Sequence, residues 1–163
     1  MTTQHANEET AKVLDAIGDT HVLLIDAVHG YDVMLEKAEP EITDTIRSIR
    51  QTNERQAGEL ASFLTSQGRH PSEDGSFMST VHEGVVRTRA FFTDIDEDVL
   101  PSVADGERWL VSSYDDALEA LAKHTQALPA ATFDAAHTLL IKHRSELEDL
   151  IRGIETRHRA MAS

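Results

Sequence analysis

The sequence predicts an all-α protein built as a four-helix bundle. Four long segments carry apolar residues at alternating spacings of three and four, which is the pattern of helices that bury one stripe. No segment shows the strict alternation of a half-buried strand, and 163 residues fall within the range of one domain. We therefore expect a single domain over residues 7–160, preceded by a flexible N-terminus over residues 1–6.

The first two helices are expected over residues 7–38 and 41–67. In the first, a seven-residue repeat runs from Leu14 to Leu35, and the helix ends before Pro40. Pro40 also suits the first turn of the second helix, whose stripe starts at Ile42 and stops before Gly68. Both helices are long enough to span a bundle.

The last two helices are expected over residues 96–128 and 133–160, with Thr132 as the N-cap of the final helix. Residues 69–75, which are polar and contain proline and glycine, are typical of a loop. A shorter crossover helix is expected over residues 76–92. It holds more apolar residues than one face can bury, which predicts a homo-oligomer: Phe77, Met78, Phe91 and Phe92.

Connection lengths choose between the possible bundle topologies. Short turns join the helices within each pair, so each pair forms an antiparallel hairpin. The two pairs are separated by roughly thirty residues, and a helix of about 15 residues covers roughly 22 Å at 1.5 Å per residue. Such a crossover returns the chain along the bundle. This favours ferritin-like connectivity, with a short crossover helix, over an up-down-up-down arrangement.

An internal echo links the two hairpins. Tyr31-Asp32-x-x-Leu35-Glu36 in the first helix recurs as Tyr114-Asp115-x-x-Leu118-Glu119 in the third long helix, as expected for a diverged duplication.

Short motifs also resemble a known family. They are Asp26-Ala-Val-His-Gly30-Tyr31, Glu59-Leu60, Gly106-Glu107 with Tyr114 and Ala117-Leu118, and Glu148-Asp149-Leu150-Ile151-Arg152. Together they resemble an uncharacterised bacterial four-helix-bundle family, grouped with ferritin-like folds, that carries a domain of unknown function. The resemblance runs from about Val13 to Arg157. It implies a ferritin-like bundle in a bacterial cytoplasm, without an established activity and with a loose link to stress physiology.

Composition excludes several classes of function. With 29 acidic and 15 basic side chains, the formal charge is -14. We therefore expect that the protein binds neither nucleic acid nor an anionic membrane surface. The absence of cysteine excludes disulfides, thiolate metal ligands and cysteine nucleophiles, and it fits a reducing compartment. The first residues lack a basic, apolar leader, and no segment is long and apolar enough to span a bilayer. We therefore expect a cytoplasmic location.

Polar residues in the apolar stripes indicate where a site would lie. Burying them costs free energy unless they are paired, and they fall within about five residues, roughly 8 Å, of the expected helix midpoints. The six residues are His21, Asn53, Gln56, Glu107, Tyr114 and His143. We expect them to form a central polar layer.

The layer has two interpretations. In the first, it is a hydrogen-bond network that fixes helix register, and the protein has no cofactor. In the second, Glu107 supplies an oxygen, and His21 and His143 supply nitrogens, to a divalent metal such as iron, manganese or zinc. A di-iron centre needs Glu-x-x-His on two helices, and the chain contains none, so ferroxidase or oxygenase activity is not expected.

A third interpretation concerns His137. The segment Ala135-Ala136-His137-Thr138-Leu139 resembles the phosphoaccepting segment of histidine phosphotransfer domains, which are also four-helix bundles. Those domains usually follow the histidine with lysine and glycine at three and four residues, where this chain has Leu140 and Ile141. Phosphotransfer is therefore a remote alternative. The main prediction is a non-enzymatic bundle with a structural or interaction role.

Overall fold

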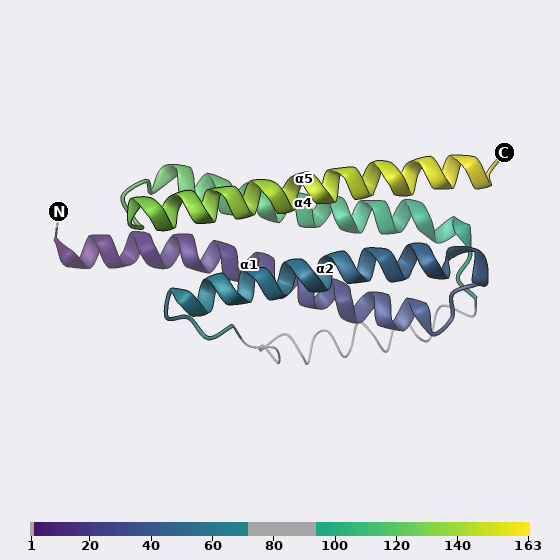
Figure 1. Ribbon diagram of the computed structural model, residues 1–163, viewed down its shortest axis with the longest axis horizontal. Helices are drawn as coiled ribbons and strands as arrows, with labels where there is room; N and C mark the ends of the chain where they lie inside the picture. Colours follow the sequence, from purple (N-terminus) through teal and green to yellow (C-terminus); the bar gives the residue numbers. More distant parts are fainter. Residues whose placement is uncertain (1, 72–93) are drawn as a thin grey trace.

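The computed structural model describes residues 2–71 and 94–163 of the chain. These ranges contain four α-helices and no strand: α1 (Thr3–Leu35), α2 (Pro40–Ser66), α4 (Leu100–Lys123) and α5 (Ala130–Met161), with a short 3-10 helix, η1 (Glu97–Val99), before α4 (Figure 1). The all-α prediction is confirmed. The crossover helix predicted over residues 76–92 lies outside the described residues.

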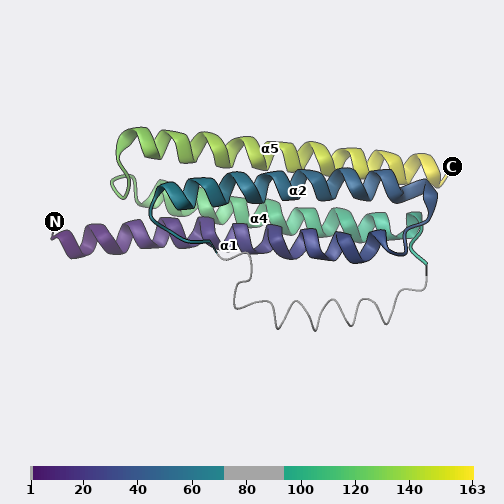
Figure 2. The ribbon, with the colours of Figure 1, turned by 60° about the horizontal axis from the view of Figure 1, so that its bottom comes forward.

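The four helices run along one axis as two antiparallel hairpins, α1 with α2 and α4 with α5 (Figures 1 and 2). Across the hairpins, α1 packs antiparallel to α4, and α2 lies antiparallel to α5. Consequently α2 and α4 run in the same direction. The chain leaves α2 at one end of the bundle and enters α4 at the other end.

The helix ends differ from the predicted ends for local reasons. Residues 3–6, expected to be flexible, are helical, because nothing in this stretch breaks a helix and α1 continues past the end of its apolar stripe. The Thr10 hydroxyl donates to the Ala127 carbonyl at 2.6 Å and fixes this end of α1 to the turn after α4. α5 begins at Ala130 with Pro129 at the N-cap, so Thr132 lies inside the first turn and the predicted cap was wrong.

α4 is shorter than predicted at both ends. Residues 96–99 form a turn in which the Asp96 carboxylate accepts a hydrogen bond from the Asp98 amide, and η1 precedes α4. At the other end, α4 stops at Lys123. Ala127 and Leu128 are still buried, because they lie in the turn that covers the end of the core. The apolar pattern in the sequence therefore continues past the end of α4, and the predicted helix end was too late for this reason.

The core consists of two apolar clusters, one toward each end of the bundle. One includes Ile17, Leu60 and Leu121, and the other includes Ile46, Leu100 and Ile154. On α2, the buried residues Asn53 and Gln56 interrupt the stripe between the two clusters. The polar layer therefore lies where the clusters meet.

The α1–α2 turn is bound to the segment before α4. Ile95 is buried; its amide donates to the Lys37 carbonyl at 3.0 Å, and its carbonyl accepts from the Glu39 amide at 2.8 Å. These bonds hold the start of the second hairpin against the turn of the first. Within residues 2–71 and 94–163, no helix combines the length and apolarity needed to cross a membrane.

The two hairpins share a polar unit that matches the internal echo. Asp32 of α1 accepts from the Arg50 guanidinium of α2, and Arg50 also binds Glu54 at 2.9 Å. In the second hairpin, Asp115 of α4 accepts from Arg144 of α5, and Arg144 binds Glu148, four residues later, at 2.9 Å. The aspartates directly follow Tyr31 and Tyr114. This shared geometry agrees with a duplicated hairpin.

Candidate functional site

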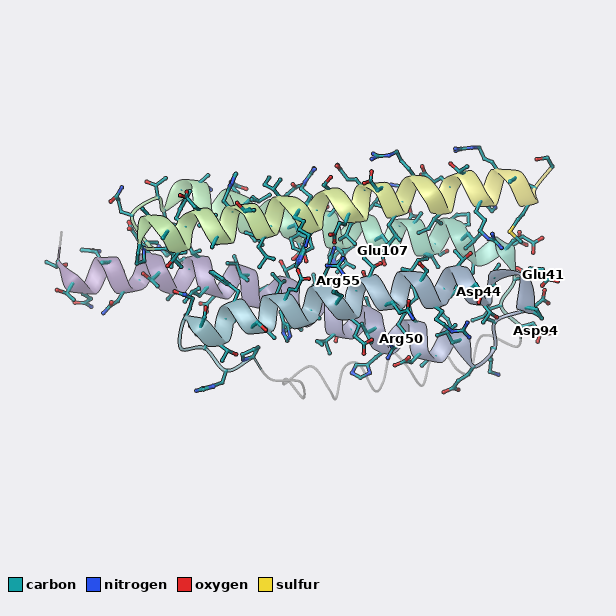
Figure 3. All side chains as sticks on the ribbon, in the orientation of Figure 1. Glu41, Asp44, Arg50, Arg55, Asp94 and Glu107 are labelled. Carbon is teal, nitrogen blue, oxygen red and sulfur yellow. The ribbon has the colours of Figure 1, made fainter. Side chains whose placement is uncertain are left out.

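The polar layer predicted from the sequence is buried. Asn53, Gln56, Glu107, Tyr114 and His143 are fully inaccessible to solvent. His21 on α1 is also buried, with 3% of its surface exposed. Glu107 lies near the middle of the bundle, with Arg55 labelled close by on the α2 side (Figure 3). The side chains form two hydrogen-bond networks.

The first network joins α1, α2 and α4 through Glu107. Its Oε1 accepts a hydrogen bond from the Tyr31 hydroxyl at 2.5 Å and one from Asn53 Nδ2 at 2.9 Å. Burial raises the pKa of Glu107 because the charged carboxylate loses hydration, and the two hydrogen bonds oppose this rise only in part. Burial and the neighbouring Glu107 raise the pKa of Tyr31.

Two oxygens of the first network have no hydrogen-bond partner. They are Glu107 Oε2 and Asn53 Oδ1, and both are buried. The same two residues are bonded to each other through their other polar atoms. Buried acceptors without partners carry a desolvation cost of about 1–3 kcal/mol each, so this pair needs a chemical explanation.

The second network joins α2, α4 and α5 through His143. Its Nε2 lies 2.5 Å from Glu59 Oε2, and its Nδ1 lies 2.9 Å from the Tyr114 hydroxyl. Tyr114 also donates to Gln56 Oε1 at 3.0 Å, and its ring meets the His143 ring edge-on. Burial lowers the pKa of His143, while its bond to Glu59 acts in the opposite direction. At neutral pH the neutral imidazole donates from Nε2 to the Glu59 carboxylate, so Nδ1 is an acceptor. The single Tyr114 hydroxyl proton therefore serves either Nδ1 or Gln56 Oε1, and the two acceptors share this donor.

A shell of charge connects the second network to solvent. Arg55 binds Glu59 at 3.0 Å and Glu146 at 2.5 Å, and Gln56 Nε2 donates to Glu146 at 3.0 Å. The bond to His143 lowers the pKa of Glu59. Burial acts to raise the pKa of Glu146, but its bonds to Arg55 and Gln56 lower it overall. Both carboxylates are about one-third exposed, and Glu146 lines an open groove between α2 and α5 together with Arg55.

The polar groups of the second network are held by hydrogen bonds to one another and are poorly suited to catalysis. Tyr114 is the hydroxyl nearest to His143, but burial raises its pKa far above the usual value, so it is a poor nucleophile or acid at neutral pH. The Glu59 carboxylate is held by both His143 and Arg55. Each donor in the second network is therefore directed at a partner inside the protein.

The three predicted metal ligands lie in different surroundings. Glu107 belongs to the first network and His143 to the second, whereas His21 lies beside two surface pockets along α1 and α2. Across the residues that the structure describes, no group of three or more histidine, aspartate or glutamate side chains is placed to hold one metal ion. The metal interpretation stays a prediction for solution experiments.

Four residues of the networks were not predicted: Tyr31, Arg55, Glu59 and Glu146. Tyr31 lies in the apolar stripe of α1 and carries a hydroxyl that needs a partner, so its role had a signal in the sequence. Arg55, Glu59 and Glu146 lie at the flank of their helices, where long charged side chains normally face solvent. The spacing within each helix does not distinguish them, although Glu59 belongs to the Glu59-Leu60 motif that resembles the family.

His137 is exposed on α5, and its ring stacks nearly parallel to the Phe133 ring at a centroid distance of 6.3 Å. No hydrogen bond or ion pair of His137 is present in the described structure. The phosphotransfer alternative stays a prediction.

The fold and the layer define a class: an all-α protein with four long helices and a buried polar layer. The family model described as Domain of unknown function (DUF2383) matches residues 12–120, which is more than half of the chain. The protein belongs to this family. The match covers most of α1, α2 and nearly all of α4, and it includes the first network but not His143 on α5. No curated protein and no solved structure shows a significant match.

Proposed function

We propose that the protein is a non-enzymatic, ferritin-like four-helix bundle with a structural or interaction role. In this proposal, the polar layer holds the helices in register. The supporting observation is that the buried polar groups bind across helices: Tyr31 and Asn53 to Glu107, and Gln56 and Tyr114 to the His143 region.

Register follows from the geometry of these bonds. A helix that slides by one residue moves its side chains by about 1.5 Å along the axis and rotates them by about 100°. Such a shift would separate Tyr31 from Glu107 and Gln56 from Tyr114, which now lie 2.5 Å and 3.0 Å apart. Apolar side chains tolerate sliding better, because dispersion has little directional preference.

The ferritin-like part of the proposal is supported by the helix arrangement. Each helix is antiparallel to its neighbours, while α2 and α4 run in the same direction and need a connection along the bundle. A bacterial source and a link to stress physiology belong to the same proposal, and they depend on the family resemblance alone. A cytoplasmic location also belongs to it, and the absence of cysteine supports this location as well.

Metal binding is the second candidate, because two buried oxygens, Glu107 Oε2 and Asn53 Oδ1, lack partners. Elemental analysis of the purified protein, with thermal unfolding in added iron, manganese or zinc, distinguishes the candidates. A register network predicts metal-free protein and an unchanged midpoint. Stoichiometric metal and a raised midpoint, both lost in His143→Leu or Glu107→Gln, would contradict our proposal and favour the metal site.

Self-association is the form of interaction that we propose. Trp109 on α4 is 68% exposed and Ile141 on α5 is 45% exposed, and these are the large apolar side chains that the described surface presents. An exposed tryptophan is a frequent anchor of interfaces.

Trp109 is the single tryptophan of the chain, so its fluorescence reports on its own surroundings. If Trp109 lies in a homo-oligomer interface, its emission shifts to longer wavelength on dilution, together with a fall in mass by light scattering. Trp109→Ser should then give the smaller mass at every concentration, whereas Ile141→Ser serves as the comparison on α5. A monomeric mass at micromolar concentration, with emission independent of dilution, would contradict self-association.

A further inference from the structure

We infer that Glu107 is a neutral carboxylic acid in the folded protein and that its Oε2 proton is donated to Asn53 Oδ1. The two side chains then form a closed acid–amide pair, with Asn53 Nδ2 donating to Glu107 Oε1 and Glu107 Oε2 donating back. This site binds one proton in the centre of the bundle. It extends the proposed register function, on which it rests.

One hydrogen bond and two oxygens without partners support this arrangement. Asn53 Nδ2 already lies 2.9 Å from Glu107 Oε1, and the two oxygens without partners belong to these same two groups. One added proton turns Oε2 into a donor and gives Oδ1 a hydrogen bond, so a single proton satisfies both atoms. An ionised Glu107 would leave both oxygens as buried acceptors without donors, together with a buried charge.

No charge around Glu107 compensates an ionised carboxylate. α1 presents the neutral phenol Tyr31, and α2 presents the amide Asn53. On α4, the titratable neighbour is Tyr114, whose pKa is far above the physiological range. Through its network residues His143 and Glu146, α5 binds Glu59, Gln56 and Arg55 instead. Within the described chain, Glu107 forms no ion pair, and Arg55 is bound to two other carboxylates.

The consequence is a stability that depends on protonation of one internal group. The pKa of Glu107 is raised above its ordinary value of 4.5. Between that value and the raised pKa, the folded state holds a proton that the unfolded state has released, so stability falls as pH rises. The contribution is complete below the unfolded pKa and is lost as pH passes through the folded pKa.

Two measurements test this assignment. Carbon NMR of the wild-type protein follows the Glu107 side-chain carboxyl, identified by its loss in Glu107→Gln, while pH is raised. We expect it to keep the shift of a protonated carboxyl at pH values where the exposed glutamates have ionised. The glutamine of the variant supplies an N–H at the position of the proton. We therefore expect the unfolding midpoint of Glu107→Gln to rise relative to that of the wild type as pH rises. The pH slopes of the free energy of unfolding should differ between the two proteins by the equivalent of up to about one bound proton.

Asp116→Asn is the matched control, because it removes one carboxylate from an exposed position of the same helix. We expect this control to keep the wild-type pH dependence. A Glu107 resonance that titrates with the exposed glutamates, combined with a lower midpoint for Glu107→Gln at every pH, would overturn the neutral acid. If that outcome is obtained and added metal does not change the unfolding midpoint, the neutral acid is wrong but the proposed register function still stands. Metal-dependent stabilisation that Glu107→Gln abolishes would overturn both.

Discussion

At the scale of the residue, burial shifts the pKa values of the two central groups, Glu107 and His143, in opposite directions. Glu107 is buried among neutral partners, and its pKa is raised. His143 is equally buried, and the loss of hydration lowers its pKa below the ordinary value of 6.5. A buried base and a buried acid both favour the uncharged form, so desolvation shifts their pKa values in opposite directions.

The His143 shift predicts sensitivity to acid. Between pH 6.5 and the lower folded pKa, the unfolded state binds a proton that the folded state does not, so stability falls as pH decreases through this window. In His143→Leu this loss should be absent, and the free energy of unfolding at neutral pH should change by about 1 kcal/mol or less. Tyr114 keeps Gln56 as its partner, and Glu59 keeps Arg55.

Chemical unfolding of both proteins between about pH 5 and 7 checks this prediction. His158→Gln, at the end of α5, is a suitable comparison, since it removes a histidine outside the layer. Equal pH dependence in wild type and His143→Leu would show that His143 does not carry the acid sensitivity.

At the scale of the element, the sequence predicted the helices well and their contacts only in part. The apolar stripes predicted six buried polar residues, and all six are buried in the structure, because burial follows the 3.6-residue period of a helix. The partners depend on how each helix is rotated against the next, and no spacing within one helix records that angle. Gln56 and Asn53 illustrate the point: they lie one turn apart on α2 but belong to different networks.

The errors at helix ends have a similar origin. Thr132 has the side chain of an N-cap, but Pro129 occupies that position and the Phe133 amide donates to its carbonyl at 2.8 Å. Leu128 follows the apolar pattern of α4 and is buried outside the helix. At both ends, the residue type and the apolar pattern predict a helix boundary a few residues from the one observed. The packing of the turn against the core sets the actual boundary.

At the scale of the whole molecule, the two hairpins share one polar unit but differ at the centre of the polar layer. Each hairpin carries the same aspartate–arginine–glutamate unit, Asp32–Arg50–Glu54 and Asp115–Arg144–Glu148. When this unit is superposed, Glu107 corresponds to Leu24, and Asn53 corresponds to Leu147. Leucine thus stands in the opposite hairpin at the positions of Glu107 and Asn53, whereas Tyr31 corresponds to Tyr114, and both leucines are fully buried.

The most direct test of the register function is therefore the NMR spectrum of the Asn53→Leu, Glu107→Leu double variant beside that of the wild type. We expect the variant to stay helical, with an unfolding midpoint equal to or above that of the wild type, because leucine removes buried polar groups. Its amide resonances should nevertheless broaden or double, since helices without the directional bonds occupy more than one register. A single sharp, well-dispersed set of resonances in the variant would contradict the claim that the layer fixes the register of the bundle.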